Sequence, residues 1–388
     1  MSRLDELINE FCPDGVEYKA ICEFCKVGTG KSNRQDADEN GEYPFYVRSK
    51  EVFLNNSYEF DEEAIIIPGE GSIGEIFHYV NGKYALHQRA YRIHIEDNYV
   101  ITKFLYYYMA QNFKKFIYQK AVNATVKSIR KPMIEKFVVP IPPLPVQREI
   151  VRILDNFTEL TAELTAELTA ELTARKKQYE YYRRNLLKCS ECVSLVELGD
   201  IAEFKYGFTD AAKIEGNAKF IRITDILENG KLNKNENRYI DLTEESKKYL
   251  LSKGDLLVAR TGATYGKTML FNDSFPSVYA SFLIRIRFKK NTILPEYYWH
   301  FAQSSLYWQQ ANKLVSKAGQ PQFNANVLRL VKISMPSIDF QRRIVDILDR
   351  FDALCNDITI GLPAEIEARQ KQYEYYRNKL LTFKEKLA

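Results

Sequence analysis

A long internal repeat dominates this sequence. Residues 141–187 align without a gap on residues 335–381, at an offset of 194, and 25 of the 47 aligned positions are identical. The segments before these blocks match more weakly, 12–24 against 192–204, at an offset of 180. The chain is therefore two homologous halves, each a globular segment followed by a helical block. The second half carries extra residues, which we place in the polar stretch 227–246.

Both repeated blocks have apolar residues at helical spacing, beginning with Val146, Ile150 and Leu154 in the first. Nothing between 147 and 187 breaks a helix, which predicts a rod of roughly 60 Å. A helix of that length cannot bury its apolar stripe on a small globule. We therefore expect the two blocks to pack together as an antiparallel coiled coil. The second should break or kink at Gly361-Leu362-Pro363.

The first block contains Thr161-Ala-Glu-Leu repeated three times through Leu172. Ala, Glu and Leu are strong helix formers, so the run is expected to be helical rather than disordered. Each tetrad would lengthen the helix by ~6 Å and rotate the residues after it by ~40°. A length ruler between the globules is one interpretation. A tolerated spacer produced by slippage in a repetitive coding tract is the other.

Outside these blocks, short β-rich runs alternate with turns that contain Gly or Pro, and a helical stretch lies near the end of each globule. Strands are expected at 64–67, 91–95, 255–259 and 282–288, and helices at 103–118 and 296–313. The predicted fold class is α+β, with two homologous domains and a pseudo-two-fold arrangement. The expected segments are a domain at 1–140, a helical region at 141–190, a second domain at 191–334 and a second helical region at 335–388.

Composition excludes several classes of protein. Apolar runs such as 64–67 are far shorter than the ~20 residues that span a bilayer, so no membrane association is expected. Residues 1–11 alternate acidic and apolar side chains, which indicates a short amphipathic helix and not a signal peptide. We expect a cytoplasmic protein whose six cysteines stay reduced. The net charge of +4 neither requires nor excludes nucleic acid.

Three short segments resemble catalytic motifs and fail on inspection. Gly28-Thr-Gly-Lys-Ser32 lacks the first glycine of a phosphate loop, because Cys25 occupies its place. The spacing of Asp14 to Glu17 and Lys19 is too tight for a nuclease metal site, and a turn is favoured. In Ile141-Pro-Pro-Leu144, an isoleucine stands where adenine methyltransferases need a polar acceptor.

Metal binding has little support. Cys22 and Cys25 form one CxxC pair and Cys189 and Cys192 another, but the pairs are too far apart for a zinc ribbon. A long-range site between the halves stays open, with reduced thiols favoured. The four histidines show no metal-ligand spacing.

Polar loops recur at matching places in both globules. In each, a glycine turn follows the central β run, at 68–74 and 260–267, then comes a polar segment, and later a loop rich in amides, hydroxyls and bases. Arg, Asn, Gln and Ser read base edges, whereas Lys, Arg and backbone amides hold phosphates. Singly, each loop also fits plain solvated surface, but the recurrence favours a bipartite DNA reader. The candidate DNA-binding residues are Gly71, Ser72, His87, Gln88, Arg89, Lys127, Ser128 and Arg130 in the first globule, and Arg260, Thr261, Thr264, Tyr265, Lys267, Tyr279, Ser281, Gln320, Gln322, Asn324 and Asn326 in the second.

The whole chain resembles a known family. Two globules, each followed by a helix that carries Gln-Arg…Ile-Leu-Asp-x-Phe (from Gln147 and Gln341) and Gln-Tyr-Glu-Tyr-Tyr-Arg (from Gln178 and Gln372), look like the specificity subunit of type I restriction-modification enzymes. The tetrads are similar to those of its type IC branch. The resemblance implies two target recognition domains, each reading one half of a split asymmetric DNA site, and helical regions that space them.

The resemblance also implies the partners. These are double-stranded DNA, two methylation subunits that carry S-adenosylmethionine and methylate an adenine in each half-site, and two restriction subunits that use ATP and Mg²⁺. The chain itself would be non-catalytic and hold no cofactor. Residues expected to space the domains or dock subunits are Leu160, Leu164, Leu168, Leu172, Gln178, Tyr179, Tyr182, Gln372, Tyr373 and Tyr376.

Two other functions remain as alternatives. The chain could be a coiled-coil scaffold whose globules bind protein partners. A nuclease or methyltransferase in its own right is disfavoured, because the motifs that such chemistry needs are missing.

Overall fold

The computed structural model describes residues 2–120, 128–188, 194–233, 236–289, 292–315, 322–356 and 361–386. The chain divides into two compact units. Unit 1 contains Met1–Thr165 and Ala368–Ala388, and unit 2 contains Ala166–Glu367. Each unit therefore joins one globular domain to one part of each helical block.

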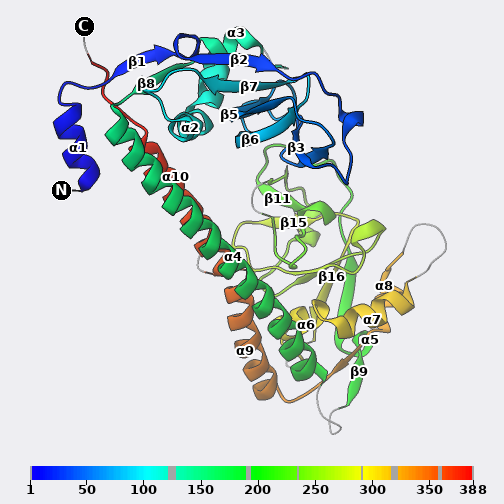
Figure 1. The fold of residues 1–388 in the computed structure, drawn as a ribbon. Helices are drawn as coiled ribbons and strands as arrows, with labels where there is room; N and C mark the ends of the chain where they lie inside the picture. The colour runs from blue at the N-terminus through cyan, green and yellow to red at the C-terminus, as the bar shows by residue number, and fades with distance from the viewer. Residues whose placement is uncertain are drawn as a thin grey trace. The chain divides into compact units, whose positions relative to one another are not determined.

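The globular part of unit 1 is an α+β domain built around a six-stranded sheet (Figure 1). Its elements are α1 (Arg3–Phe11), β1 (Glu17–Ala20), β2 (Cys25–Thr29), β3 (Tyr43–Tyr46), β4 (Val52–Asn55), β5 (Phe60–Pro68), β6 (His78–Leu86), β7 (Ala90–Ile95), α2 (Thr102–Lys120), α3 (Lys131–Glu135) and β8 (Val138–Ile141). The sheet order is β2-β7-β5-β6-β3-β4, and only β3 and β6 run parallel. β1 and β8 form a separate antiparallel ribbon, α2 packs against β5, and α3 against β2. The expected N-terminal helix and the strands expected within this domain are confirmed.

Unit 2 has a related set of elements. They are β9 (Leu195–Glu197), α5 (Leu198–Ile201), β10 (Ala202–Tyr206), β11 (Ala218–Ile221), β12 (Tyr239–Ile240), β13 (Leu256–Ala259), β14 (Thr268–Leu270), β15 (Ser277–Tyr279), β16 (Leu283–Phe288), α6 (Pro295–Ala302), α7 (Ser305–Leu314), α8 (Ala325–Arg329) and β17 (Lys332–Ser334). Its sheets have the orders β10-β16-β13-β14, β12-β11-β15 and β17-β9. The helical stretch expected at 296–313 is two helices and not one. Ser304 lies between them and caps the second, since its hydroxyl accepts a hydrogen bond from the Tyr307 N–H.

The strands that correspond to the six-stranded sheet of unit 1 form two separate sheets in unit 2, β10-β16-β13-β14 and β12-β11-β15. β6 of unit 1 pairs with β5 on one side and β3 on the other. Its counterpart in unit 2 is two short strands, β14 beside β13 and β15 parallel to β11. Residues 271–276 separate them and read Phe-Asn-Asp-Ser-Phe-Pro, in which Asn, Asp, Ser and Pro favour a turn. The strand breaks at this point, and the sheet divides.

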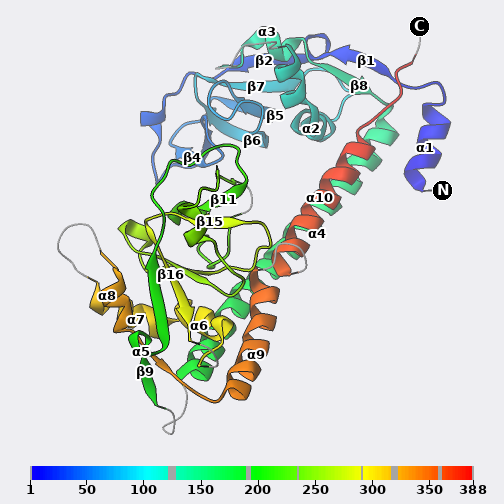
Figure 2. The same ribbon diagram turned by 180° about the vertical axis from the view of Figure 1, so that it is seen from behind.

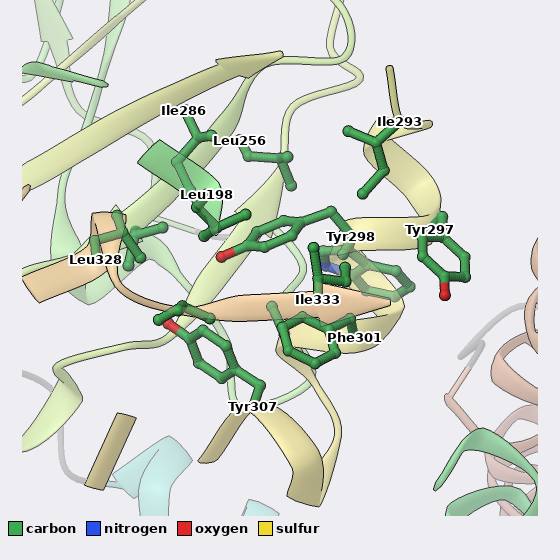
Figure 3. Close-up of a cluster of buried hydrophobic side chains, with 14 of the residues drawn as sticks. Leu198, Leu256, Ile286, Ile293, Tyr297, Tyr298, Phe301, Tyr307, Leu328 and Ile333 are labelled. Atoms are coloured by element: carbon green, nitrogen blue, oxygen red, sulfur yellow. The ribbon is translucent and has the colours of Figure 1, made fainter. Parts of the chain in front are cut away.

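Each unit has its own buried core. Figure 3 shows the core of unit 2, where side chains from β13 and β16 meet the aromatic face of α6. Leu256 and Ile286 lie on the sheet side, and Tyr297, Tyr298 and Phe301 on the helix side. The core of unit 1 pairs β5 and β7 with α2 in the same manner, through residues such as Ile65, Ile93 and Phe104.

The helical blocks form α4 (Leu144–Lys188), α9 (Ile338–Asn356) and α10 (Leu362–Leu380). In unit 1, the start of α4 lies beside α10, and both Figure 1 and Figure 2 show the two side by side. The Thr158 and Tyr373 hydroxyls are 2.9 Å apart, and the Phe157 and Tyr376 rings lie 6.0 Å apart. The break expected at residues 361–363 is confirmed, since α9 and α10 are separate helices.

Unit 2 repeats this packing with the equivalent residues. The Phe351 ring stacks on Tyr179 at 5.9 Å and on Tyr182 at 5.4 Å. Phe351 is the repeat counterpart of Phe157, and Tyr182 that of Tyr376, at the offset of 194. The shared Phe and Gln-Tyr-Glu-Tyr-Tyr-Arg motifs therefore hold a pair of helices together in each unit.

A buried glutamine ties each helical block to its own domain. The Gln147 side-chain oxygen accepts the Ile101 N–H (2.8 Å), and its amide nitrogen donates to the carbonyls of Tyr99 (2.8 Å) and Pro142 (2.7 Å). Gln341 repeats this with the Leu294 N–H and the Pro336 carbonyl, both at 2.9 Å. Both glutamine residues are 0% exposed. Because a buried amide needs partners, these bonds set how the helix leaves the domain.

Candidate nucleic-acid interface

Three of the loops predicted to contact DNA meet in unit 1. The Gly69 N–H donates to the Arg89 carbonyl (2.9 Å), and the Gly69 carbonyl accepts the Ile129 N–H (2.7 Å). An isolated antiparallel bridge joins Glu70 to Ser128. The glycine turn after β5, the β6–β7 turn and the segment before α3 therefore form one surface.

Unit 2 has an equivalent set of main-chain hydrogen bonds joining the same three loops. We call this set, together with its isolated bridge, the frame of each unit. The Arg260 N–H donates to the Phe282 carbonyl (3.1 Å), and its carbonyl accepts the Phe323 N–H (2.8 Å). An antiparallel bridge joins Thr261 to Gln322. Arg260 occupies the place of Gly69, and Phe323 that of Ile129. The polar loops that recur in the sequence are therefore joined by the same pattern of main-chain hydrogen bonds in both units.

In each unit, a glycine allows its own segment to pack closely against the backbone next to the polar turn. A Cβ atom on Gly30 would lie 1.8 Å from the Leu86 carbonyl oxygen, and one on Gly207 would lie 2.1 Å from that of Ala280. Parallel bridges lie next to these glycines, Ser32 with His87 in unit 1 and Phe208 with Ala280 in unit 2. Gly30 belongs to the segment that resembles a phosphate loop, but the close approach of the Leu86 carbonyl shows that this glycine allows strand packing.

Charged side chains gather on the frame of unit 1. Oε2 of Glu70 lies 2.8 Å from Nη1 of Arg48 and 3.1 Å from Nη1 of Arg89. The three side chains are 43% (Arg48), 37% (Glu70) and 57% (Arg89) exposed, so solvent or a ligand reaches all of them. Hydrogen bonds from Arg89 and Arg48 hold the pKa of the Glu70 carboxyl below its usual value. A pocket of about 280 Å³ beside them is lined by Arg34, Val47, Arg48, Ser49, Glu70, Gly71 and His87.

His87 is an uncharged donor at the wall of this pocket. It is 5% exposed, and burial, with help from Arg48 and Arg89, lowers its pKa. Its Nδ1 lies 3.0 Å from the backbone N–H of Arg89, which can only donate. The imidazole proton is therefore on Nε2.

The frame of unit 2 carries different side chains. The Arg260 guanidinium lies between two rings, 5.2 Å from the centre of Tyr206 and 5.6 Å from that of Phe282. Its Nε has no hydrogen-bond partner among the described residues. Tyr265 donates to Asn312 (2.7 Å), and Lys267 pairs with Glu228. This surface offers one stacked arginine and amides where unit 1 offers an acid between two arginines.

The predicted DNA-binding residues differ in how far their side chains are exposed to solvent. Gly71, Ser72, Gln88, Arg89, Arg130, Gln322 and Asn326 are exposed, and Ser128, Arg260, Thr264, Tyr265, Lys267, Ser281 and Asn324 are half-buried. Lys127 and Gln320 lie outside the described residues. His87 and Thr261 are buried at the frame itself. The prediction for Tyr279 is wrong, because this side chain is 0% exposed in the core beside β11 and cannot reach DNA. Arg34 and Arg48 line the pocket beside Glu70 but were not among the predicted residues, since they come from segments without a repeated motif.

The predicted spacer and docking residues divide between packing and surface. Leu160, Tyr182, Gln372 and Tyr376 are exposed, Leu164, Leu172, Gln178 and Tyr373 are half-buried, and Leu168 and Tyr179 are buried. Tyr179 cannot dock another subunit, because its hydroxyl lies 3.2 Å from Nδ1 of buried His300. Nε2 of His300 in turn lies 2.7 Å from Asp349. Tyr179 is thus a contact within unit 2.

The described part of the chain holds no group of three or more His, Cys, Asp or Glu side chains suited to a metal ion. Burial raises the pKa of the Cys25 thiol far above its usual value, which keeps it protonated. Cys189 and Cys192 lie outside the described residues. Among the described helices, none is long and apolar enough to cross a membrane.

The family model and the similar proteins all belong to one family, the specificity subunits of type I restriction enzymes. The family model of the type I restriction modification DNA specificity domain matches twice, at residues 13–174 and 191–368. A putative type I restriction enzyme specificity subunit of Haemophilus influenzae is 34% identical over 400 residues, covering 95% of this chain and 96% of that one. The EcoR124I/EcoR124II specificity subunit of Escherichia coli is 34% identical over 307 residues, which cover 74% of this chain and 72% of that one.

Two solved structures share the fold. The HsdS subunit from Thermoanaerobacter tengcongensis superposes with a TM-score of 0.54 at 14% identity, covering 95% of this chain and 97% of that one. A chain from a study of the assembly and conformational transition of a type I restriction-modification system superposes with a TM-score of 0.68 at 14% identity, covering 95% and 98%.

Proposed function

The chain belongs to the type I restriction-modification DNA specificity family, and from this premise we propose that each of its units reads one half of a split, asymmetric DNA site. A specificity subunit recognises the DNA target and assembles with methylation and restriction subunits. Membership in this family decides against the free-standing coiled-coil scaffold.

One observation carries the assignment of one unit to one half-site. Both units build the same main-chain frame from a glycine turn, a polar turn and a late loop, yet they display different side chains on it. A shared frame provides the same approach to DNA, because backbone amides and glycine turns position the phosphates. Different side chains then read different bases, so the two half-sites differ.

A domain exchange tests this proposal. Residues 1–140 are replaced by the equivalent segment of a relative, and methylated adenines are mapped in cells that also express the methylation subunit. One half-site should change while the other is kept. The reciprocal exchange of residues 191–334 is the matched control and should change the other half-site only. A change of both half-sites by either exchange contradicts the proposal.

The remaining parts of the assembly rest on the same premise. Two methylation subunits would supply S-adenosylmethionine, and two restriction subunits would supply ATP and Mg²⁺ chemistry, so this chain is a non-catalytic reader. The absence of a methyltransferase motif in the sequence supports this. The purified chain should transfer no methyl group from labelled S-adenosylmethionine to DNA, whereas the chain with its methylation subunit should. Transfer by the chain alone would overturn the non-catalytic role.

A further inference from the structure

The frame of unit 1 presents an acid where the frame of unit 2 does not. Glu70 stands at the bridge to Ser128, and the equivalent position in unit 2 is Thr261, which is 8% exposed. Arg89 lies in the β6–β7 turn, at the place where unit 2 has Phe282. Because the frames match and these side chains do not, Glu70 and its arginines are not required by the fold of the frame.

The placement of Glu70 does not suit a purely phosphate-binding surface. A carboxylate 2.8 Å and 3.1 Å from two guanidinium groups reduces the positive charge that a phosphate would meet. It would also repel the phosphate directly. A half-exposed acid on this surface can contact DNA favourably only where DNA offers it a hydrogen-bond donor.

A G·C base pair offers what this cluster needs. On its major-groove edge, the cytosine N4 amino group is a donor, while guanine O6 and N7 accept from an arginine. Glu70 carries only acceptors, and Arg48 and Arg89 carry only donors. Glu70 lies within hydrogen-bond distance of both Arg48 and Arg89, so neighbouring groups on one base-pair edge can meet both kinds of side chain.

We propose that Glu70, flanked by Arg48 and Arg89, reads a G·C pair in the half-site bound by unit 1, with the carboxylate accepting from cytosine N4 and an arginine donating to guanine. This inference rests on the proposed function and names the bases that it leaves open. The pair of arginines, with Arg34 at the same pocket, keeps the local charge positive despite the acid. Glu70 also keeps the guanidinium groups oriented before DNA arrives.

The test uses the chain assembled with its methylation subunit. Variants Glu70→Gln, Arg48→Ala and Arg89→Ala methylate a library of duplexes in which the unit 1 half-site is randomised and the unit 2 half-site is fixed. Glu75→Gln is the matched control, because Glu75 lies in the same glycine turn, is exposed and pairs with Lys114 of α2. We expect Glu70→Gln to lower the preference for a G·C pair at one position by about five- to a hundredfold. At least one arginine variant should relax the same position, and Glu75→Gln should relax none.

Two results overturn the inference. Glu70→Gln can leave every base preference as Glu75→Gln does, or it can change methylation equally on all sequences, which would make Glu70 a general electrostatic group. Glu70→Gln is nearly isosteric, so it decides the matter even if an arginine variant fails to fold. The unsubstituted assembly separates this inference from the proposed function: if it methylates a split site, the function holds whatever Glu70 does.

Discussion

The buried glutamine at the start of α4 gives a quantitative test of how helix and domain are joined. Gln147→Leu keeps the volume and removes three hydrogen bonds, to the Ile101 N–H and to the carbonyls of Tyr99 and Pro142. Each bond contributes about 1 kcal/mol net, and a buried backbone group left without a partner costs about 1–3 kcal/mol. We expect a loss of about 3–4 kcal/mol, after allowing for the apolar contacts that leucine gains.

The assay exploits the position of the tryptophans. The only two in the sequence, Trp299 and Trp308, belong to unit 2, so their fluorescence reports unit 2 while far-UV circular dichroism reports both units. In urea, with a slope of about 2–3 kcal/mol per M, Gln147→Leu should lower the midpoint of unit 1 unfolding, followed by dichroism, by about 1–2 M and the fluorescence midpoint by less. Gln341→Leu should move the fluorescence transition instead.

Gln372 is exposed, so Gln372→Leu is the control for replacing a glutamine amide by an apolar side chain, and it should leave both transitions in place. If Gln147→Leu shifts the dichroism midpoint no more than Gln372→Leu does, the buried glutamine does not stabilise the junction of helix and domain.

Three further outcomes are expected from the structure. Gly30→Ala and Gly207→Ala should each lower the free energy of unfolding by about 1–3 kcal/mol, because the new methyl group overlaps a carbonyl oxygen. Gly28→Ala is the control in the same urea experiment and should be tolerated, because its methyl group would have no contact under 3.5 Å. The lowered pKa of His87 means that the unfolded chain binds more protons, so stability should fall as the pH drops below the ordinary value of 6.5, and less so in His87→Gln; equal slopes in both proteins would contradict this. Deleting one tetrad, residues 165–168, should change the separation of methylated half-sites in a mapped genome, and an unchanged separation would rule out the ruler.

The repeat made most of the architecture predictable from the sequence. Identity at 25 of 47 positions established two halves, and unbroken apolar spacing predicted α4. Gly361 and Pro363 predicted the break before α10, because proline cannot continue a helix. These features depend on local chemistry, which a sequence displays directly.

Features that depend on distant partners were not predictable in the same way. The sequence places Tyr279 beside Ser281 in a polar segment, but a parallel partner strand turns its ring into the core. Arg48 lies 22 residues from Glu70, and only the sheet brings the two within 2.8 Å. The loops themselves were found because they recur, whereas Arg48 has no equivalent in the second half to mark it.

Whether each unit reads its own half-site is decided by mapping methylated adenines after residues 1–140 are exchanged for those of a relative. We expect a new sequence in one half-site, with the other half-site and the spacing retained. A site that changes in both halves, or in neither, would show that the units do not read separate half-sites.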